Sequence, residues 1–240
     1  GDLGVDEDFS EQWIVDLIQQ REIYLIPMLN VDGNRYDREV FCGEDGWNCD
    51  KAGWRKNLRN NHASGVTPWI DDEQVDEGCD GVDLNRNYDH YWNTCPTTQP
   101  GSSAFSESET SANSVYMNTV VPEADLYVTM HTGVWIMLYP WGKWPEQPSD
   151  WELFHYIRDD VHANISDIPI QNANQGLYPN CGTSRDYGYG VMGFPTFTFE
   201  TDDEQFVPGS AESLEDRLGE EMDVMRYLID NVWYLSLIHI

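Results

Sequence analysis

A carboxylate and an imidazole stand at the ends of two apolar stretches of this sequence. Glu200 ends the alternating run FPTFTFE, and His131 follows LYVTM. Partial burial at the end of such a run should raise the proton affinity of Glu200, which suits a general base near neutral pH. The alternative is a structural ion pair with a neighbouring Arg. His131 is either a metal ligand or a structural histidine.

Several polar groups could recognise a substrate carboxylate. Arg55 in GWRKN and Arg86 in DLNRN could form bidentate bonds to it, with Asn85 adding an amide donor. Their alternative role is to neutralise an acidic surface. Tyr178 in QGLYPNCG could be a mobile phenol or an ordinary exposed loop aromatic. Arg185 in GTSRDY is an isolated cation in an acidic chain.

Strand-like and helix-like stretches alternate along the chain, which predicts one α/β domain with a mixed, mostly parallel central sheet flanked by helices. In such sheets ligands gather at the carboxyl ends of strands, where His131 and Glu200 are placed. The residues between Tyr36 and Pro100 show little periodicity and predict long ordered loops. Helices are expected over 8–20 with Ser10 as N-cap, 106–121, 151–165 and 210–235, and strands over 22–30 (followed by a turn), 124–131 and 194–200.

Composition narrows the classes of partner. The formal net charge is −30 and the pI is about 4.1, so phosphate would be repelled and no nucleic acid is expected. The mean hydropathy is −0.57 and no run approaches a membrane span, so no membrane partner is expected. With only three Lys, the acidic surface suits a high-salt habitat, where screening relieves self-repulsion. Unfolding at low salt and refolding at molar salt would test that halophilic character.

The chain has five Cys, an odd number. Cys42 with Cys49, and Cys79 with Cys95, flank short loops and could pair, which would leave Cys181 unpaired or bonded outside the chain. This usage favours an exported, extracellular protein.

Eight motifs in order give the chain a family resemblance. IPMLNVDGN, GWRKN, GVDLNRNYD, SSAFSESET, YVTMHTG, LYPWG, LYPNCGTSRDY and FTFE together resemble the zinc metallocarboxypeptidases of the carboxypeptidase A/B type, peptidase family M14. The spacing from Tyr178 to Asp186 and on to Glu200 also matches that family. The resemblance implies the zinc carboxypeptidase fold and a zinc-dependent exopeptidase acting on peptide C-termini, expected here as a monomer.

The resemblance also implies catalytic roles. Zinc in this family is held by two His and one Glu, and His131 matches the second His. Glu200 matches the carboxylate that activates the zinc-bound water and passes its proton to the leaving amine. Arg55 matches the Arg that polarises the scissile carbonyl and stabilises the oxyanion.

Substrate-binding roles follow by the same resemblance. Asn85 and Arg86 match the clamp for the terminal carboxylate, and Tyr178 matches the mobile Tyr that closes over it. Arg185 matches the floor of the pocket for the terminal side chain, so charge complementarity predicts selection of terminal Glu or Asp. The alternative is that Arg185 turns away to pair with a local acid such as Asp186.

One family motif is missing from the sequence. None of the six His is followed by Glu at the third position, so the His-x-x-Glu metal motif, expected upstream of NVDGN, is absent. We therefore expect residues 1–235 to be a catalytic domain truncated at its N-terminus, without its first strands and inactive alone, and 236–240 to be a non-native tail. Two alternatives stay open: a non-catalytic module that binds peptide C-termini, and a related peptidase acting on cell-wall peptides or glutamylated tails.

Overall fold

The structure is a computed structural model, and it describes residues 11–37, 53–61, 79–97, 99–201 and 211–238. Its helices and strands are α1 (Glu11–Gln20), α2 (Val31–Tyr36), the 3₁₀ helix η2 (Leu84–Arg86), α3 (Ser108–Thr119), β1 (Tyr127–His131), β2 (Trp135–Tyr139), α4 (Trp151–Asn164), β3 (Ile170–Asn172), α5 (Ala173–Gly176), α6 (Ser184–Gly190), β4 (Thr196–Thr201) and α7 (Ala211–Ile238).

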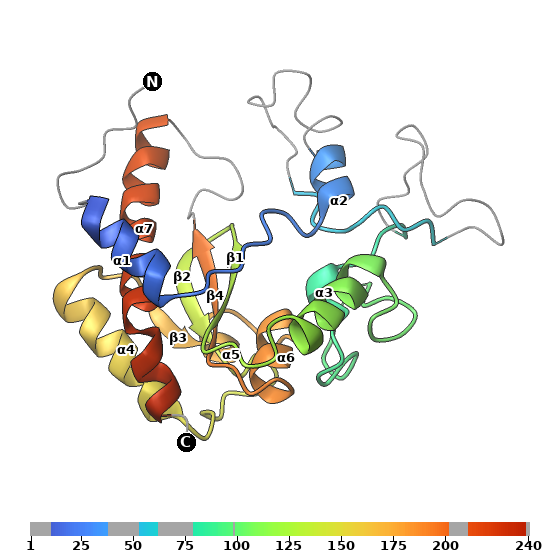
Figure 1. Cartoon of the computed structure of the whole chain (residues 1–240). Coiled ribbons are helices and arrows are strands. Elements are labelled where there is room, and N and C mark those ends of the chain that lie inside the picture. Colours follow the sequence, from blue (N-terminus) through green and yellow to red (C-terminus); the bar gives the residue numbers. More distant parts are fainter. Residues whose placement is uncertain (1–10, 38–52, 62–78, 98, 202–210, 239–240) are drawn as a thin grey trace.

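The strands form one mixed sheet in the order β1-β4-β2-β3. The pairs β1–β4 and β2–β3 are parallel, and β2–β4 is antiparallel. Helices α4 and α7 lie on one side of the sheet, and α3 and α6 lie on the other (Figure 1). The predicted α/β class with a mostly parallel mixed sheet is confirmed.

Strand β4 shows why the sequence folds in this way. Phe197 and Phe199 alternate with threonines, and both Phe side chains are fully buried in the core that α4 and α7 cover. Thr196 and Thr198 therefore face the opposite side, because successive side chains of a strand point to opposite faces. Glu200 follows with the same parity as the threonines, on the face where α6 packs.

Three of the predicted helices are present: α3 corresponds to 106–121, α4 to 151–165 and α7 to 210–235. Two of the predicted strands are also present: β1 corresponds to 124–131 and β4 to 194–200. The helix over 8–20 is α1, whose expected cap, Ser10, lies outside the described residues. Helix α7 continues through Ile238, into the segment expected to be a non-native tail. That expectation and the domain boundary at 235 stay predictions.

The predicted strand over 22–30 is wrong. The segment has no regular secondary structure, with bends at Pro27 and Leu29, and it pairs with no strand among the described residues. Ile23 and Leu25 are 56% and 79% exposed, so the described residues do not bury this apolar run as they bury a strand of the sheet. The turn expected after it is helix α2, which Asn30 begins by accepting a hydrogen bond from the Gly33 N–H. Strands β2 and β3 were not predicted.

The predicted Cys79–Cys95 pair is also wrong. Cys95 forms a disulfide with Cys181, with their Cα atoms 5.6 Å apart, and Cys79 is a free, exposed thiol. The bond joins residues 86 positions apart in sequence, which short-loop reasoning could not find. The expected partners Cys42 and Cys49 lie outside the described residues.

Candidate functional site

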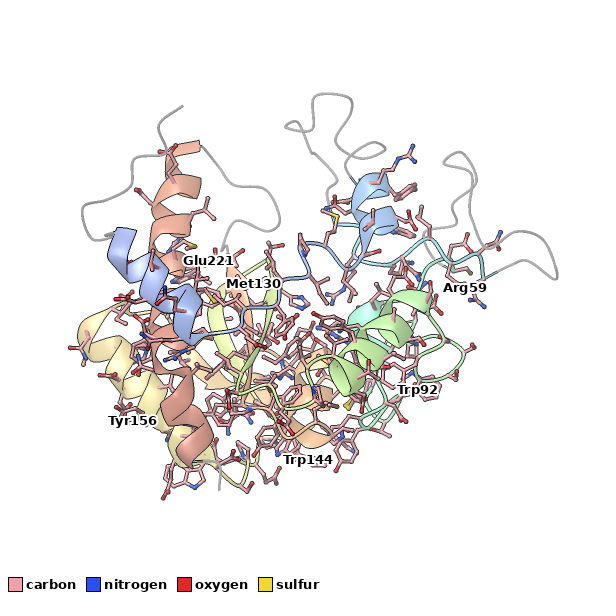
Figure 2. The ribbon with its side chains drawn as sticks, in the orientation of Figure 1. Arg59, Trp92, Met130, Trp144, Tyr156 and Glu221 are labelled. Carbon is pink, nitrogen blue, oxygen red and sulfur yellow. A yellow bond between two sulfur atoms is a disulfide. The ribbon has the colours of Figure 1, made fainter. Side chains whose placement is uncertain are left out.

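His131 and Glu200 lie directly opposite each other in the parallel register of β1 and β4. Neighbouring side chains in register point to the same face of a sheet, so the imidazole and the carboxylate share one face. Met130, one position earlier in β1, is 45% exposed on the other face (Figure 2). The adjacency expected from strand ends is therefore present, while the roles of both residues stay predictions.

Glu200 is 9% exposed and lies between two different neighbours. On one side its register partner is His131, and on the other it is the apolar Ile136 of β2. Burial raises the pKa of Glu200 to about 7, although the charges of Arg55, Arg185 and Arg86 act to lower it. A carboxyl group with that pKa can both accept and return a proton near neutral pH.

His131 is held as a neutral imidazole. Burial, with the nearby charge of Arg55, lowers the pKa of His131 to about 4. Its Nε2 atom lies 3.4 Å from Nδ2 of Asn85. A neutral imidazole is the form that can bind a metal ion or accept a hydrogen bond.

Asp83 positions two of the candidate groups, and sequence reasoning did not single it out. One oxygen of this buried carboxylate, Oδ2, lies 2.9 Å from Nε of Arg55. The other, Oδ1, accepts a hydrogen bond from the backbone N–H of Asn85 and so begins η2. The Asp-x-Asn spacing of DLNRN is the local signal for such a cap.

Arg86 and Tyr178 meet above this turn. Arg86 donates from Nη1 to the carbonyl of Asn85 (2.6 Å) and from Nη2 to the Tyr178 hydroxyl (3.1 Å). The ring of Tyr178 is about half exposed. Although burial acts to lower the pKa of Arg55, Asp83 and the Tyr178 hydroxyl hold it above its ordinary value. The guanidinium group of Arg55 therefore stays charged.

Asn85 joins this turn to helix α6. Its Oδ1 atom accepts a hydrogen bond from the backbone N–H of Ser184 at 3.0 Å. That contact turns Nδ2 toward His131. The structure therefore brings Arg55, Asn85, Arg86 and Tyr178 close to His131 and Glu200, and the roles expected of them stay predictions.

Arg185 lies in the first turn of α6 and is only 2% exposed. Its Nη2 lies 2.9 Å from Oδ1 of Asp186, and Nη2 also donates to Oδ1 of Asn180 at 2.9 Å. Nη1 donates over a longer 3.4 Å to the Thr198 hydroxyl of β4. The alternative of an ion pair with Asp186 is thus realised, while the guanidinium still acts on the pKa values of both Glu200 and His131.

The described residues do not assemble a zinc site. Among them, no group of three or more His, Cys, Asp or Glu side chains could hold a metal ion. His131 is the member of the expected ligand set that they supply, and a single imidazole is a poor site for zinc. The described part of the chain also contains no helix with the length and apolar character needed to cross a bilayer.

The mixed α/β sheet carries a carboxylate and an imidazole in register at adjacent strand ends, where α/β proteins gather their ligands. The chain matches the family model of peptidase M14, zinc carboxypeptidase, over residues 7–220. It therefore belongs to the zinc carboxypeptidase family.

Individual relatives support this family membership. The chain is 29% identical to mast cell carboxypeptidase A of Homo sapiens over 78% of its own length and 42% of that protein. It is 28% identical to zinc carboxypeptidase A 1 of Drosophila melanogaster over 84% of its length and 47% of that protein. The chain thus spans about half the length of the curated relatives that it matches.

Solved structures share the fold. Thrombin activatable fibrinolysis inhibitor superposes with a TM-score of 0.71 at 24% identity, covering 92% of this chain and 56% of the other. Carboxypeptidase A from Helicoverpa armigera superposes with a TM-score of 0.58 at 23% identity, covering 89% of this chain and 48% of the other.

Proposed function

We propose that this protein is a zinc-dependent exopeptidase that hydrolyses the C-terminal peptide bond and prefers terminal Glu or Asp. One observation carries the proposal. In a chain of formal charge −30, three of the few cations, Arg55, Arg86 and Arg185, lie close enough to Glu200 to act on its pKa. Such a convergence of cations on one buried carboxylate suits a ligand that carries two negative charges.

The α-carboxylate of the substrate is assigned to Arg86 and Asn85. A guanidinium forms charge-assisted bidentate bonds to a carboxylate, and the neighbouring amide adds one donor. Tyr178 lies over this position, with its hydroxyl 3.1 Å from Nη2 of Arg86. Because only a chain end supplies this carboxylate, the clamp accounts for exopeptidase action.

The side-chain carboxylate is assigned to Arg185. Asp186 and Asn180 hold the guanidinium by Nε and Nη2, while Nη1 makes one long bond to Thr198. A guanidinium has five N–H donors, so Nη1 retains capacity for a ligand. Thr198 shares its face of β4 with Glu200, so that donor lies on the side of the general base.

Proton transfer is assigned to Glu200, and oxyanion stabilisation to Arg55. A carboxyl group with a pKa of about 7 can take a proton from water and return it to the leaving amine. Arg55 is fixed by Asp83 and stays charged, as an oxyanion partner must. One Zn²⁺ is proposed with His131 as a ligand; because the described residues supply no other, no step is routed through the metal.

A second candidate is a non-catalytic module that captures peptide C-termini through the same arginines, since these contacts need no metal ion. A peptidase acting on cell-wall peptides or glutamylated tails would use Arg185 in the same way.

We place the protein outside the cell, since a disulfide such as Cys95–Cys181 persists in oxidising compartments.

Matched peptides test the proposal. A peptide ending in Glu is compared with its C-terminal amide, by calorimetry for binding and by release of Glu for hydrolysis. We expect the amide to bind at least tenfold more weakly and to release nothing, and Arg86→Gln to abolish that difference. Arg158→Gln, which removes a cation paired with Asp159 on α4, is the control. Equal binding of acid and amide would contradict the proposal. Binding without release, in protein expressed from its full reading frame, would favour the non-catalytic module.

A further inference from the structure

We propose that Asn180 determines the selectivity of this site, because its neutral amide orients Arg185 without offsetting the positive charge. The inference rests on the proposed function. It adds a residue to which the sequence analysis assigned no role. The ligand recognised here is a terminal side chain that carries a carboxylate.

Asn180 is buried, 6% exposed, and uses both ends of its amide. Its Oδ1 accepts the hydrogen bond from Nη2 of Arg185 at 2.9 Å, and its Nδ2 donates to the backbone carbonyl of Tyr178 at 2.6 Å. These partners fix the orientation of the amide, since a flipped amide would set its NH₂ group against the guanidinium. One side chain thus connects the cation to the backbone that carries the candidate clamp tyrosine.

The backbone at Gly142 closes the same cluster. The N–H of Asn180 donates to the Gly142 carbonyl at 2.8 Å, and the Gly142 N–H donates to Oδ2 of Asp186 at 2.9 Å. A Cβ atom at Gly142 would lie 2.1 Å from Oδ1 of Asn180 and 2.4 Å from Nη2 of Arg185. The amide and the guanidinium therefore pack closely against the backbone at Gly142, which leaves no room for a side chain at that position.

Charge explains why an amide at position 180 matters. Arg185 already has one carboxylate partner, Asp186, at 2.9 Å, and both side chains are buried. A second carboxylate on the guanidinium would give the cluster a net negative charge, which would repel an acidic ligand in a site with little solvent. Asn180 satisfies the same N–H donor with a neutral oxygen, so the cation keeps its attraction for a ligand carboxylate.

The test compares two substrates that differ only in charge. Peptides ending in Glu and in Gln have nearly the same shape, so the ratio of their kcat/KM values measures recognition of the carboxylate. The protein is expressed from its full reading frame as wild type, Asn180→Asp and Asn180→Ala. Asn174→Asp is the matched control, because Asn174 also donates from Nδ2 to the Gly142 carbonyl and lies on the neighbouring helix α5. Binding of the same peptides is measured by calorimetry.

We expect Asn180→Asp to lower the Glu-to-Gln ratio at least tenfold, Asn180→Ala to lower it about threefold by loosening Arg185, and Asn174→Asp to keep it within about twofold of wild type. Structural damage alone would lower kcat/KM equally for the two substrates. The Glu-to-Gln ratio would then stay unchanged, and that result would overturn the inference. If Asn180→Asp does not fold, an unchanged ratio in Asn180→Ala would overturn it equally. A wild-type protein that does not prefer Glu would instead remove the proposed acidic selectivity, and this inference with it.

Discussion

His131 and Glu200 face each other across the parallel pair β1 and β4, so sheet hydrogen bonding sets their relative position. A slip of one residue in either strand would turn one of the two side chains to the opposite face. The sheet is therefore what keeps the imidazole and the carboxylate together. Arg86 lies in η2 and Arg185 in α6, while Arg55 lies in the segment 53–61 and is held by Asp83.

Glu200→Gln should separate chemistry from binding. Loss of the proton acceptor should lower kcat by about 10²–10⁴-fold. Affinity for a peptide ending in Glu should stay the same or increase, because the substitution removes a negative charge near Arg55, Arg86 and Arg185. Steady-state kinetics and calorimetry check the two parts, with the exposed Glu152→Gln as control. A variant retaining a tenth of wild-type kcat would argue against the general-base role.

Gly142→Ala should displace Arg185. The new Cβ would overlap Asn180 and Arg185, and overpacking of this kind lowers the free energy of unfolding by about 1–3 kcal/mol. Preference for terminal Glu should be lost at the same time. Gly219→Ala in α7 is the control, since its Cβ would meet nothing within 4 Å and should stabilise the helix by about 0.5–1 kcal/mol. Denaturant unfolding and the Glu-to-Gln ratio measure both effects; a variant with unchanged selectivity would contradict the geometry.

Glu221→Gln should make stability less dependent on pH. Burial raises the pKa of Glu221 from 4.5 to about 7, so the folded state binds this proton more tightly than the unfolded state does. The free energy of unfolding therefore falls as pH rises from about 4.5 to 7, and the penalty is fully present above pH 7.

Because Glu221 remains partly exposed to water, we expect the substitution to stabilise the protein by about 1 kcal/mol at pH 8, and by little at pH 4. Glu215→Gln, at an exposed position of the same helix, removes the same charge without the burial. Thermal unfolding at the two pH values compares the variants. A gain that is equal at both pH values, or equal in both variants, would show that the burial of Glu221 has no such effect.

Removal of the Cys95–Cys181 disulfide should be costly. The bond closes a loop across 86 positions, and loss of such a crosslink lowers the free energy of unfolding by about 2–5 kcal/mol. The double variant Cys95→Ala, Cys181→Ala tests this by denaturant unfolding. Cys79→Ser should have no effect, because that thiol is exposed and free. If the Cys79 variant were the unstable one, the pairing would be different from that described.

Sequence patterns predicted the elements whose buried residues follow a regular spacing within one segment. Phe197 and Phe199 alternate with threonines and mark β4 directly. The segment containing Ile23 and Leu25 is a continuous apolar run, but a strand also needs a partner, and no strand pairs with it among the described residues. Strand β3, Ile170–Asn172, is too short to show any period.

The site also has features that sequence could predict and features that it could not. The positions of His131 and Glu200 at strand ends predicted that they share a site, and the sequence motifs pointed to the three arginines. Several contacts that hold the site together could not be predicted, because they join distant positions: Arg86 contacts Tyr178 across 92 positions, and Asn85 contacts Ser184 across 99. Propensity and periodicity describe neighbours in sequence, so such pairs require the folded chain.

The most direct test of the central claim follows release of the terminal amino acid from three peptides that end in Glu, Phe and Lys, each with and without a chelator. The protein is expressed from its full reading frame. We predict that Glu is released preferentially and that the chelator stops the reaction. Preferential release of Phe or Lys would contradict the role given to Arg185, and release that persists in the chelator would contradict a zinc-dependent reaction at this site.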